Sequence, residues 1–329
     1  MVATYTKRGG TPYMDDLFVT TLDKVRKEMI DLVFRKYPAL AVLLEVKDDN
    51  FMASGGEQFQ VNVEYAPNPN GGWMHEDESI SMEDYELLTS GFYDIKHLGY
   101  GIRWPKSVKR INRGSQAAYN LVDKKISNTT RTIQQLLNSG LWTGDGTNDK
   151  ILQGLPYMIP ATLPASQTTS VGGISPVTYP LWRTQASDMD GISSTGALED
   201  YMLNMCNTIQ AQGGKPSWIF CDQATHETYE KNARDFLVEK PTKIADVNFM
   251  LCEYKGIPVI FDLSAPAGEM RFVDGADMKF CVDPMFWMEW TDWKEIPNVA
   301  FTKVKQVICD CNMARTAGRT HGCIFNISE

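Results

Sequence analysis

The sequence contains none of the short motifs that mark the common enzyme classes. A G-x-x-x-x-G-K-S/T phosphate loop, a G-x-S-x-G nucleophile elbow, an H-E-x-x-H zinc helix and a dinucleotide fingerprint are all absent. Histidine is rare as well, because only four occur in 329 residues and they fall in unrelated segments. We therefore predict no catalytic residue, no cofactor and no set of metal ligands.

Long apolar runs are also missing. No stretch reaches the roughly 18 apolar residues that a membrane span needs. The first ten residues, MVATYTKRGG, are polar and basic, and no apolar run follows them. The sequence therefore predicts a protein that has no membrane partner and stays in the compartment where it is made.

Basic residues are outnumbered, since 32 Lys and Arg stand against 41 Asp and Glu and give a net charge of −9. Neutralising phosphates requires clustered basic residues, so this balance argues against binding nucleic acid over the whole surface. The content of 43% hydrophobic and 22% charged residues is ordinary for a folded protein. At this length, the core is expected to divide into two or more lobes.

Seven cysteines all lie in the second half of the chain, mostly at positions typical of apolar strands or helices. An odd number without a targeting signal favours reduced, buried thiols. Cys309 and Cys311 are two residues apart and share one face of a predicted strand. They could bind a metal only if two more ligands converged there, so packing in the core is the preferred interpretation.

The first third of the chain predicts a helix followed by an extended arm. Apolar residues at three- and four-residue spacing predict a helix over 15–37, ended by Pro38. Strict alternation predicts a strand over 58–65, and a second strand-like run covers 92–104. The polar segment 66–91 is longer than most loops, and a two-stranded hairpin is not stable alone in water. We therefore expect the arm to lie on another copy of the protein.

The remaining chain mixes helices and strands. Residues 115–139 predict a long helix with one apolar stripe, which would span about 37 Å at ~1.5 Å per residue. Residues 178–282 alternate short helices and strands, and long strands return at 300–314 and 321–327. This order predicts an α+β fold in which the mixed middle segment is an inserted lobe.

Charge is unevenly distributed between two segments. Residues 49–95 contain ten acids and no Lys or Arg, whereas residues 103–131 contain eight basic residues and one acid. We hypothesise that the acidic arm of one subunit lies over the basic helix of the next and guides register during assembly. The alternative is two solvated faces. The acidic residues of this interface hypothesis are Glu76, Asp77, Glu78, Glu83, Asp84 and Glu86. Its basic residues are Lys106, Lys109, Arg110, Arg113, Lys124, Lys125 and Arg131.

The order of these segments resembles that of the major capsid proteins of tailed bacteriophages, which have the Hong Kong 97 fold. The resemblance rests on the arm, the long helix and four short sequences: G-L-W-T-G-D-G (140–146), L-Q-G-L-P (152–156), V-G-G-I (171–174) and Y-P-L-W-R (179–183). It implies an N-terminal arm and first helix over 1–57 and an extended two-stranded loop over 58–104. It further implies a peripheral domain with the spine helix over 105–177 and 283–329, and an inserted mixed α/β axial domain over 178–282.

The resemblance also implies a function without catalysis. Many copies would assemble into pentamers and hexamers and close an icosahedral head around double-stranded DNA, which is enclosed but not bound at specific sequences. The expected location is the virion, assembled in the bacterial host cytoplasm. The implied partners include a portal protein. Some members of the family carry a cleaved N-terminal scaffolding segment, but only about fifteen residues precede the first predicted helix here. The resemblance therefore implies either a separate scaffolding protein or a mature cleaved product. Some members of the family join their subunits by an isopeptide bond from a lysine of the extended loop to an asparagine. No lysine occurs between Lys47 and Lys96, so the arm tip cannot supply one, and cement proteins are a further option.

Two alternatives remain at this point. The first is a nanocompartment shell of the encapsulin type, which shares the fold but holds an enzyme cargo; a cargo-docking site would distinguish it. The second is a soluble enzyme of two lobes with an unrecognised site. It would form a small closed oligomer and contain a polar pocket with perturbed titratable groups.

Overall fold

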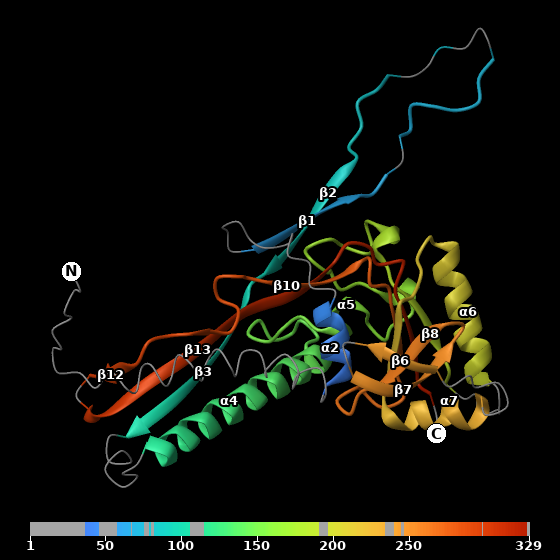
Figure 1. Cartoon of the computed structure of the whole chain (residues 1–329). Coiled ribbons are helices and arrows are strands. Elements are labelled where there is room, and N and C mark those ends of the chain that lie inside the picture. The colour runs from blue at the N-terminus through green and yellow to red at the C-terminus, as the bar shows by residue number, and fades with distance from the viewer. Residues whose placement is uncertain are drawn as a thin grey trace, which may run out of the picture.

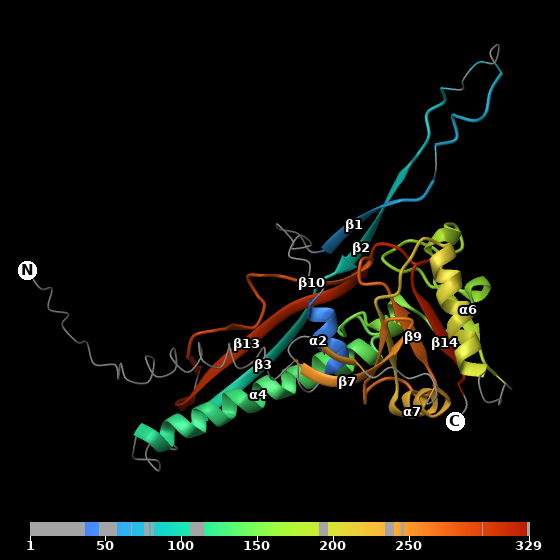
Figure 2. The ribbon, with the colours of Figure 1, turned by 45° about the vertical axis from the view of Figure 1, so that its right-hand side comes forward.

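The computed structural model describes residues 37–45, 58–66, 68–75, 79, 82–105, 115–190, 197–233, 240–244, 247–297 and 299–327. The described elements form an arm, an elongated limb and a rounded lobe (Figure 1, Figure 2). Except for Tyr37, the helix expected over 15–37 lies outside these residues. Within the described ranges, no helix has both the length and the apolar character required to cross a bilayer.

The limb contains the predicted long helix, α4 (Ser115–Thr143). Buried apolar residues at helical spacing line one side of it: Ile126, Ile133, Leu137 and Leu141. The helix ends at Thr143 instead of the predicted Ser139. Burial of Leu141 and Trp142 explains the extra turn, because their packing outweighs the cost of about 1 kcal/mol for a glycine such as Gly140 inside a helix.

A five-stranded antiparallel sheet runs beside α4, and its central strand is β13 (Val299–Arg315). This strand confirms the long strand predicted over 300–314. The strands that pair with it are β3 (Lys96–Pro105), β10 (Met278–Val282), β11 (Glu289–Trp290) and β12 (Lys294–Ile296). Cys309 and Cys311 of β13 are buried in the largest core cluster. The limb is therefore a long helix packed on a long, twisted ribbon.

The lobe is built on a seven-stranded sheet in the order β4-β14-β9-β5-β8-β7-β6. The strands are β4 (Gln185–Asp188), β5 (Trp218–Cys221), β6 (Lys240–Ile244), β7 (Val247–Tyr254), β8 (Ile257–Phe261), β9 (Met270–Val273) and β14 (Gly322–Phe325). Two helices pack on it, α6 (Ala197–Ala211) and α7 (Gln223–Ala233). Most of these elements confirm the mixed segment expected from the sequence.

Two strands, β14 and β10 (Met278–Val282), lie in a different sheet from the one expected. The resemblance placed the last strand with the spine helix, but β14 pairs with β4 and β9 in the lobe. Conversely, β10 precedes residue 283 yet pairs with β13 in the limb. Both strands are short and almost entirely buried. Their sequences therefore contain no alternation of apolar and polar residues that would show to which sheet each strand belongs.

Short helices fill the region where limb and lobe meet. Pro38 does not end a described helix but begins one, α2 (Pro38–Glu45), since proline suits the first turn of a helix. Leu40 and Leu43 of α2 are buried in the core cluster that includes residues of α4 and β13. The other short helices are α5 (Leu155–Met158) and the 3₁₀ helices η2 (Pro164–Ser166) and η3 (Pro180–Trp182).

The arm consists of β1 (Gln58–Glu64) and β2 (Leu88–Asp94), joined by the excursion between them. The strands pair antiparallel, with Gln58 opposite Asp94 at the base. The arm extends away from both limb and lobe (Figure 1, Figure 2). The strand-like run over 92–104 is divided at Ile95, because Lys96 begins β3, which pairs with β13 instead of β1. The two-stranded part therefore ends ten residues earlier than the expected boundary at 104.

Candidate functional site

Large apolar side chains are exposed along the arm. Trp73 is fully exposed and Met82 is 90% exposed. Leu88 and Phe92 on β2 are about half exposed. None of these four side chains belongs to a core cluster of the described residues. Apolar surface is stabilised by roughly 25 cal/mol per Å² when it leaves water, so the arm has the composition of a contact surface.

Few hydrogen bonds join the described residues in the outer part of the arm. Beyond the paired strands, the Tyr65 amide donates to the carbonyl of Leu87 at 3.1 Å. Further out, the side-chain amide of Asn70 donates to the carbonyl of Glu83. The described residues of this outer part therefore lack the ladder that would fix a hairpin on its own.

The base of the arm is held by buried contacts. We call this region the arm root, and its residues are Phe92, Tyr93, Asp94, Gly172, Asn312 and Arg315. They come from β2, from the turn within V-G-G-I and from the end of β13. The arm root therefore joins the arm to the limb at one end of the limb's central strand.

Tyr93 is the buried anchor of β2. Its side chain is fully buried, and its hydroxyl donates to the carbonyl of Arg315 at 3.2 Å. Burial raises the pKa of Tyr93 to about 12, so the hydroxyl keeps its proton at neutral pH. Next to it, the amide of Phe92 donates to the carbonyl of Gly172 at 2.9 Å. Gly172 has a φ of 61°, and a Cβ there would lie 2.8 Å from Cζ of Tyr93, so both its conformation and its contact favour glycine.

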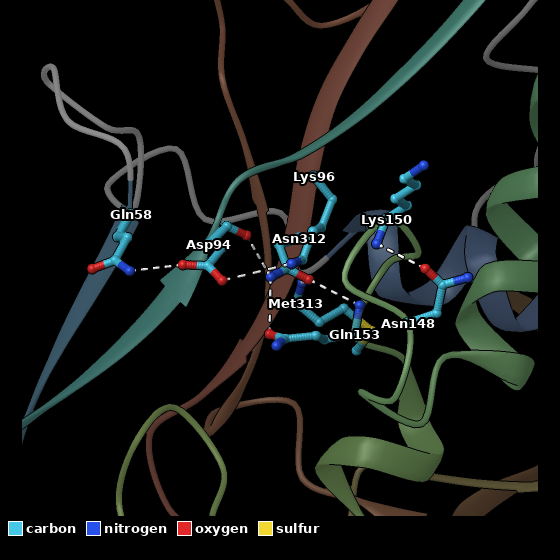
Figure 3. A network of polar contacts seen from close by, with 8 residues as sticks. All are labelled: Gln58, Asp94, Lys96, Asn148, Lys150, Gln153, Asn312 and Met313. Atoms are coloured by element: carbon cyan, nitrogen blue, oxygen red, sulfur yellow. Dashed lines mark hydrogen bonds and ion pairs between the residues drawn. The ribbon is translucent and has the colours of Figure 1, made fainter.

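Asn312 on β13 connects three segments (Figure 3). Its Nδ2 donates to the backbone carbonyl of Asp94 at 2.7 Å and to Oε1 of Gln153 at 3.0 Å. Its Oδ1 accepts from the amides of Gln153 at 3.1 Å and Met313 at 2.8 Å. These four bonds use the full capacity of the buried amide. The side chain thereby fixes the arm, the limb strand and the loop after α4 relative to one another.

The carboxylate of Asp94 adds a hydrogen bond and an ion pair that are more exposed. Its Oδ1 accepts from Nε2 of Gln58 at 2.7 Å, and its Oδ2 lies 3.6 Å from Nζ of Lys96. Figure 3 shows these contacts beside Asn312. Because the Asp94 side chain is 54% exposed, the ion pair contributes little to stability. It helps to set where β1, β2 and β3 diverge.

Arg315, the last residue of β13, is fully buried. Its guanidinium donates to the carbonyl of Met158, and to that of Trp182 at 2.9 Å. The guanidinium carbon also lies 4.9 Å from the centre of the Trp182 ring, a cation–π contact. Burial lowers the pKa of Arg315 to about 10, which leaves the group charged at neutral pH. Arg315 therefore joins the arm root to α5 and η3.

The structure describes only part of the acidic surface of the interface hypothesis. Glu83, Asp84 and Glu86 are exposed on the arm. Glu76, Asp77 and Glu78 lie outside the described residues. The exposed position of the three described acids leaves them accessible to a second chain.

The basic surface is likewise described in part. Lys106, Lys109, Arg110, Arg113 and the side chain of Lys124 lie outside the described residues. Arg131 is exposed on α4. Lys125 donates to the carbonyl of Arg103 at 3.1 Å and lies 5.0 Å from the centre of the Trp104 ring. Lys125 therefore holds α4 on β3 within its own chain.

Within one chain, the described parts of the acidic and basic surfaces do not meet. The arm and the first turns of α4 lie at opposite ends of the molecule in both views (Figure 1, Figure 2). A contact between them therefore requires two chains.

The sequence analysis did not single out the arm root. Asn312 offered a signal, because an amide is uncommon inside the apolar strand predicted over 300–314. Arg315 offered none, since its burial depends on segments far away in the sequence. The V-G-G-I sequence was noted only as part of the resemblance, whereas its turn forms a hydrogen bond to β2.

The cysteines agree with the sequence-based prediction. All seven lie in the described part of the chain, all are buried and none forms a disulfide. Burial raises the pKa of Cys323 to about 12, so this thiol stays protonated and unreactive.

A cavity at the start of α7 bears on the enzyme alternative. It is lined by Asp222, Thr225 and Glu269 among others. Asp222 caps α7, because it accepts the Ala224 amide at 3.2 Å and the Thr225 hydroxyl. Glu269 forms an ion pair with the buried Arg271. Both carboxylates therefore have structural partners.

Comparison with known proteins gives a consistent result for the fold. No known family profile and no curated protein sequence matches the chain. Among solved structures, a chain of the cyanophage A-1(L) capsid asymmetric unit superposes with a TM-score of 0.66 at 15% identity, covering 89% of this chain and 93% of that one. A chain of Mycobacterium phage Bobi gives a TM-score of 0.56 at 11% identity, covering 86% and 89%.

A third similar structure is the holo-SrpI encapsulin complex from Synechococcus elongatus PCC 7942. It gives a TM-score of 0.52 at 10% identity, covering 83% of this chain and 82% of that one. In all three cases the likeness extends beyond any single part of the molecule, because more than four fifths of the chain is covered. The chain has the α+β fold of the Hong Kong 97 type.

Proposed function

We propose that this chain is a structural shell protein, the major capsid protein of a tailed-phage type of particle. Many copies assemble into pentamers and hexamers, which close into an icosahedral shell that encloses double-stranded DNA. The proposed role includes no catalytic step and places the protein in the virion. The acidic net charge suits a shell that encloses DNA without binding it tightly.

The observation that carries this proposal is the match to the cyanophage capsid chain. It covers 89% of this chain and 93% of that one, so it extends well beyond the lobe. A shared lobe alone would support only a common domain, because one fold can host many functions. A match over nearly the whole chain supports a shared way of assembling.

The exposed arm supports the same conclusion independently. An arm with Trp73 and Met82 in solvent is unfavourable in an isolated chain. The buried arm root holds its base in a defined direction. Such an arm can pack on a second copy of the chain. Repeating that contact around a ring generates a closed assembly.

The first test is electron microscopy of the purified full-length chain in negative stain, together with its mass in solution at low and high salt. The proposal predicts closed shells or rings of five or six subunits. A uniform monomer or dimer at every salt concentration, with or without a co-expressed scaffolding protein, would contradict it and favour the enzyme alternative.

We further propose that charge guides the arm to its neighbour. The described groups that carry this proposal are the exposed acids Glu83, Asp84 and Glu86 on the arm and Arg131 on α4. Exposed charges act over about 8 Å at physiological salt. They therefore affect the rate and register of assembly more than the final affinity.

Charge reversal tests this part separately. The double variant Glu83→Lys with Asp84→Lys should assemble more slowly than wild type, as followed by light scattering. Its matched control is Asp149→Lys with Asp292→Lys, which changes the net charge equally at exposed positions away from the arm. Equal rates for the two double variants would show that only net charge matters and would overturn the guiding role.

The proposed partners follow from the same role. We propose a portal protein at one vertex and a separate scaffolding protein during assembly, with cement proteins as a further option. Co-expression with the scaffolding protein should shift the products towards particles of uniform size, measured by light scattering. An unchanged size distribution would contradict a scaffold requirement.

The encapsulin match supports a second candidate function, a nanocompartment shell with a protein cargo. The two candidates differ in particle content. Mass spectrometry and the ultraviolet spectrum of particles from the native source should show double-stranded DNA for a capsid. An abundant second protein without DNA would instead identify a nanocompartment.

A further inference from the structure

Three potential metal ligands meet on the outer side of the lobe. His226 and Glu230 lie four residues apart on α7, and Cys252 lies on β7. Residues four apart in a helix share one face, so both side chains lie on the same side of α7. One ligand atom from each of the three residues lies within 4.8 Å of the other two.

The distances suit a small ion. Nδ1 of His226 lies 3.6 Å from Oε1 of Glu230, and Sγ of Cys252 donates to the same oxygen at 3.3 Å. In a tetrahedral zinc site with bonds of 2.0 to 2.3 Å, neighbouring ligand atoms lie about 3.3 to 3.8 Å apart. The two measured separations fall in this range without any movement of the backbone.

The surroundings also fit a metal-binding histidine. The imidazole of His226 is 92% buried, packs 5.2 Å from the ring of Phe261 and hydrogen bonds to the backbone carbonyl of Val259. A backbone contact of this kind orients metal-binding imidazoles in many proteins. Burial also lowers the pKa of His226, which favours the neutral form that binds metals.

We propose that His226, Glu230 and Cys252 bind one Zn²⁺ ion and thereby fix α7 to β7. A nitrogen, a carboxylate oxygen and a sulfur are all established zinc donors, and their mixture favours zinc over Mg²⁺ or Ca²⁺. On binding, the thiol of Cys252 releases its proton to water and the thiolate forms the bond to zinc. Two negative ligands then balance the charge of the ion in this partly buried place.

The fourth position of the proposed site is taken by water. The Glu230 side chain is 47% exposed, so the site opens to solvent on that side. Because β7 and β6 form one edge of the seven-stranded sheet, the ion would secure that edge to the helix packed beside it. This role is independent of the proposed function, because it concerns one chain.

The test uses the full-length protein, purified without a histidine tag, equilibrated with Zn²⁺ and then dialysed. Mass spectrometry of the metal content should find about one zinc ion per chain. The variants Cys252→Ser and Glu230→Gln should bind zinc at least about tenfold more weakly. Glu230→Gln changes a half-exposed side chain and is expected to fold normally. The matched control is Cys323→Ser, which changes a buried cysteine of the same sheet outside the cluster.

Co²⁺ provides a second readout. Wild type and Cys323→Ser should give the thiolate-to-cobalt absorption band, and Cys252→Ser should not. A chelator should lower the unfolding temperature of wild type but not that of Cys252→Ser. The proposal is overturned if wild type retains no zinc, or if Cys252→Ser and Glu230→Gln retain as much as Cys323→Ser does.

Discussion

The arm and the lobe differ most in where their apolar side chains lie. In the lobe, Phe220 and Phe272 are fully buried in two separate core clusters. In the arm, Trp73 and Met82 lie in solvent. The lobe can be stable within one chain, whereas the described residues of the outer arm have too few internal contacts to be. The lobe therefore folds through its own core, and we propose that the outer arm is stabilised by contact with a second copy.

The arm root lies at the boundary between these two regimes. Tyr93 belongs to the arm in sequence but is as buried as any residue of the lobe. Substitutions at the root should therefore affect the stability of a single chain, and substitutions in the outer arm should affect only association. The following predictions test that division, beginning with the largest expected effect.

Arg315→Met should destabilise the chain most. Methionine fills a similar volume but leaves the carbonyls of Met158 and Trp182 without their buried donor. We expect the free energy of unfolding to fall by about 3 kcal/mol or more, measured by urea denaturation. The control Arg131→Met changes an exposed arginine and should stay within about 0.5 kcal/mol of wild type. Equal effects would show that Arg315 does not stabilise the root.

Gly172→Ala should have the next largest effect. Gly172 and Gly173 both have positive φ, at 61° and 78°, so alanine costs about 1–2 kcal/mol of backbone strain at either. Only at Gly172 would the new Cβ also meet Tyr93, at 2.8 Å. We expect Gly172→Ala to lower the unfolding free energy by at least about 1 kcal/mol more than Gly173→Ala. Thermal denaturation of both variants measures the difference, and no difference would exclude a tight contact.

The pH dependence of the unfolding free energy should reveal the lowered pKa of His321, which is buried near the start of β14. Burial, followed by the charge of Arg315, lowers its pKa from 6.5 to about 3. Between these values only the unfolded chain binds the proton, so stability is complete above pH 6.5 and falls as the pH falls. From pH 6.5 to 5.5, wild type should lose about 1 kcal/mol relative to His321→Asn. Parallel pH profiles of the two proteins would contradict this assignment.

Trp73→Ala should have the smallest effect on the folded chain. Its side chain is fully exposed, so the unfolding free energy should change by less than about 0.5 kcal/mol. Assembly, however, should weaken, because the partner loses a large apolar contact. Urea denaturation and light scattering of the same preparation separate the two effects. A loss of stability without a loss of assembly would contradict the claim that outer-arm residues affect only association.

Local periodicity predicted the elements whose environment is uniform along their length. The stripe of α4 and the alternation of β1 were both visible in the sequence. The assignment of strands to sheets was less accessible. β3 leaves the arm at Ile95 without a turn residue, and β14 and β10 lie in different sheets from those expected.

The functional residues divide in the same way. Acidic and basic segments could be counted from the sequence, whereas Asn312 and Arg315 acquire their roles only from segments more than 100 residues away. The cluster of His226, Glu230 and Cys252 was likewise hidden, because Cys252 comes from another element. Spacing reveals ligands on one helix, but not the strand that faces it.

Hydrogen–deuterium exchange of assembled and dissociated protein tests the central claim most directly. The account predicts that backbone amides of residues 66–87 exchange rapidly in the dissociated chain and become protected in the assembly. Amides of β5 and β9 in the lobe should exchange slowly in both. Rapid exchange of residues 66–87 in both states would contradict the claim that the arm is covered by a second copy.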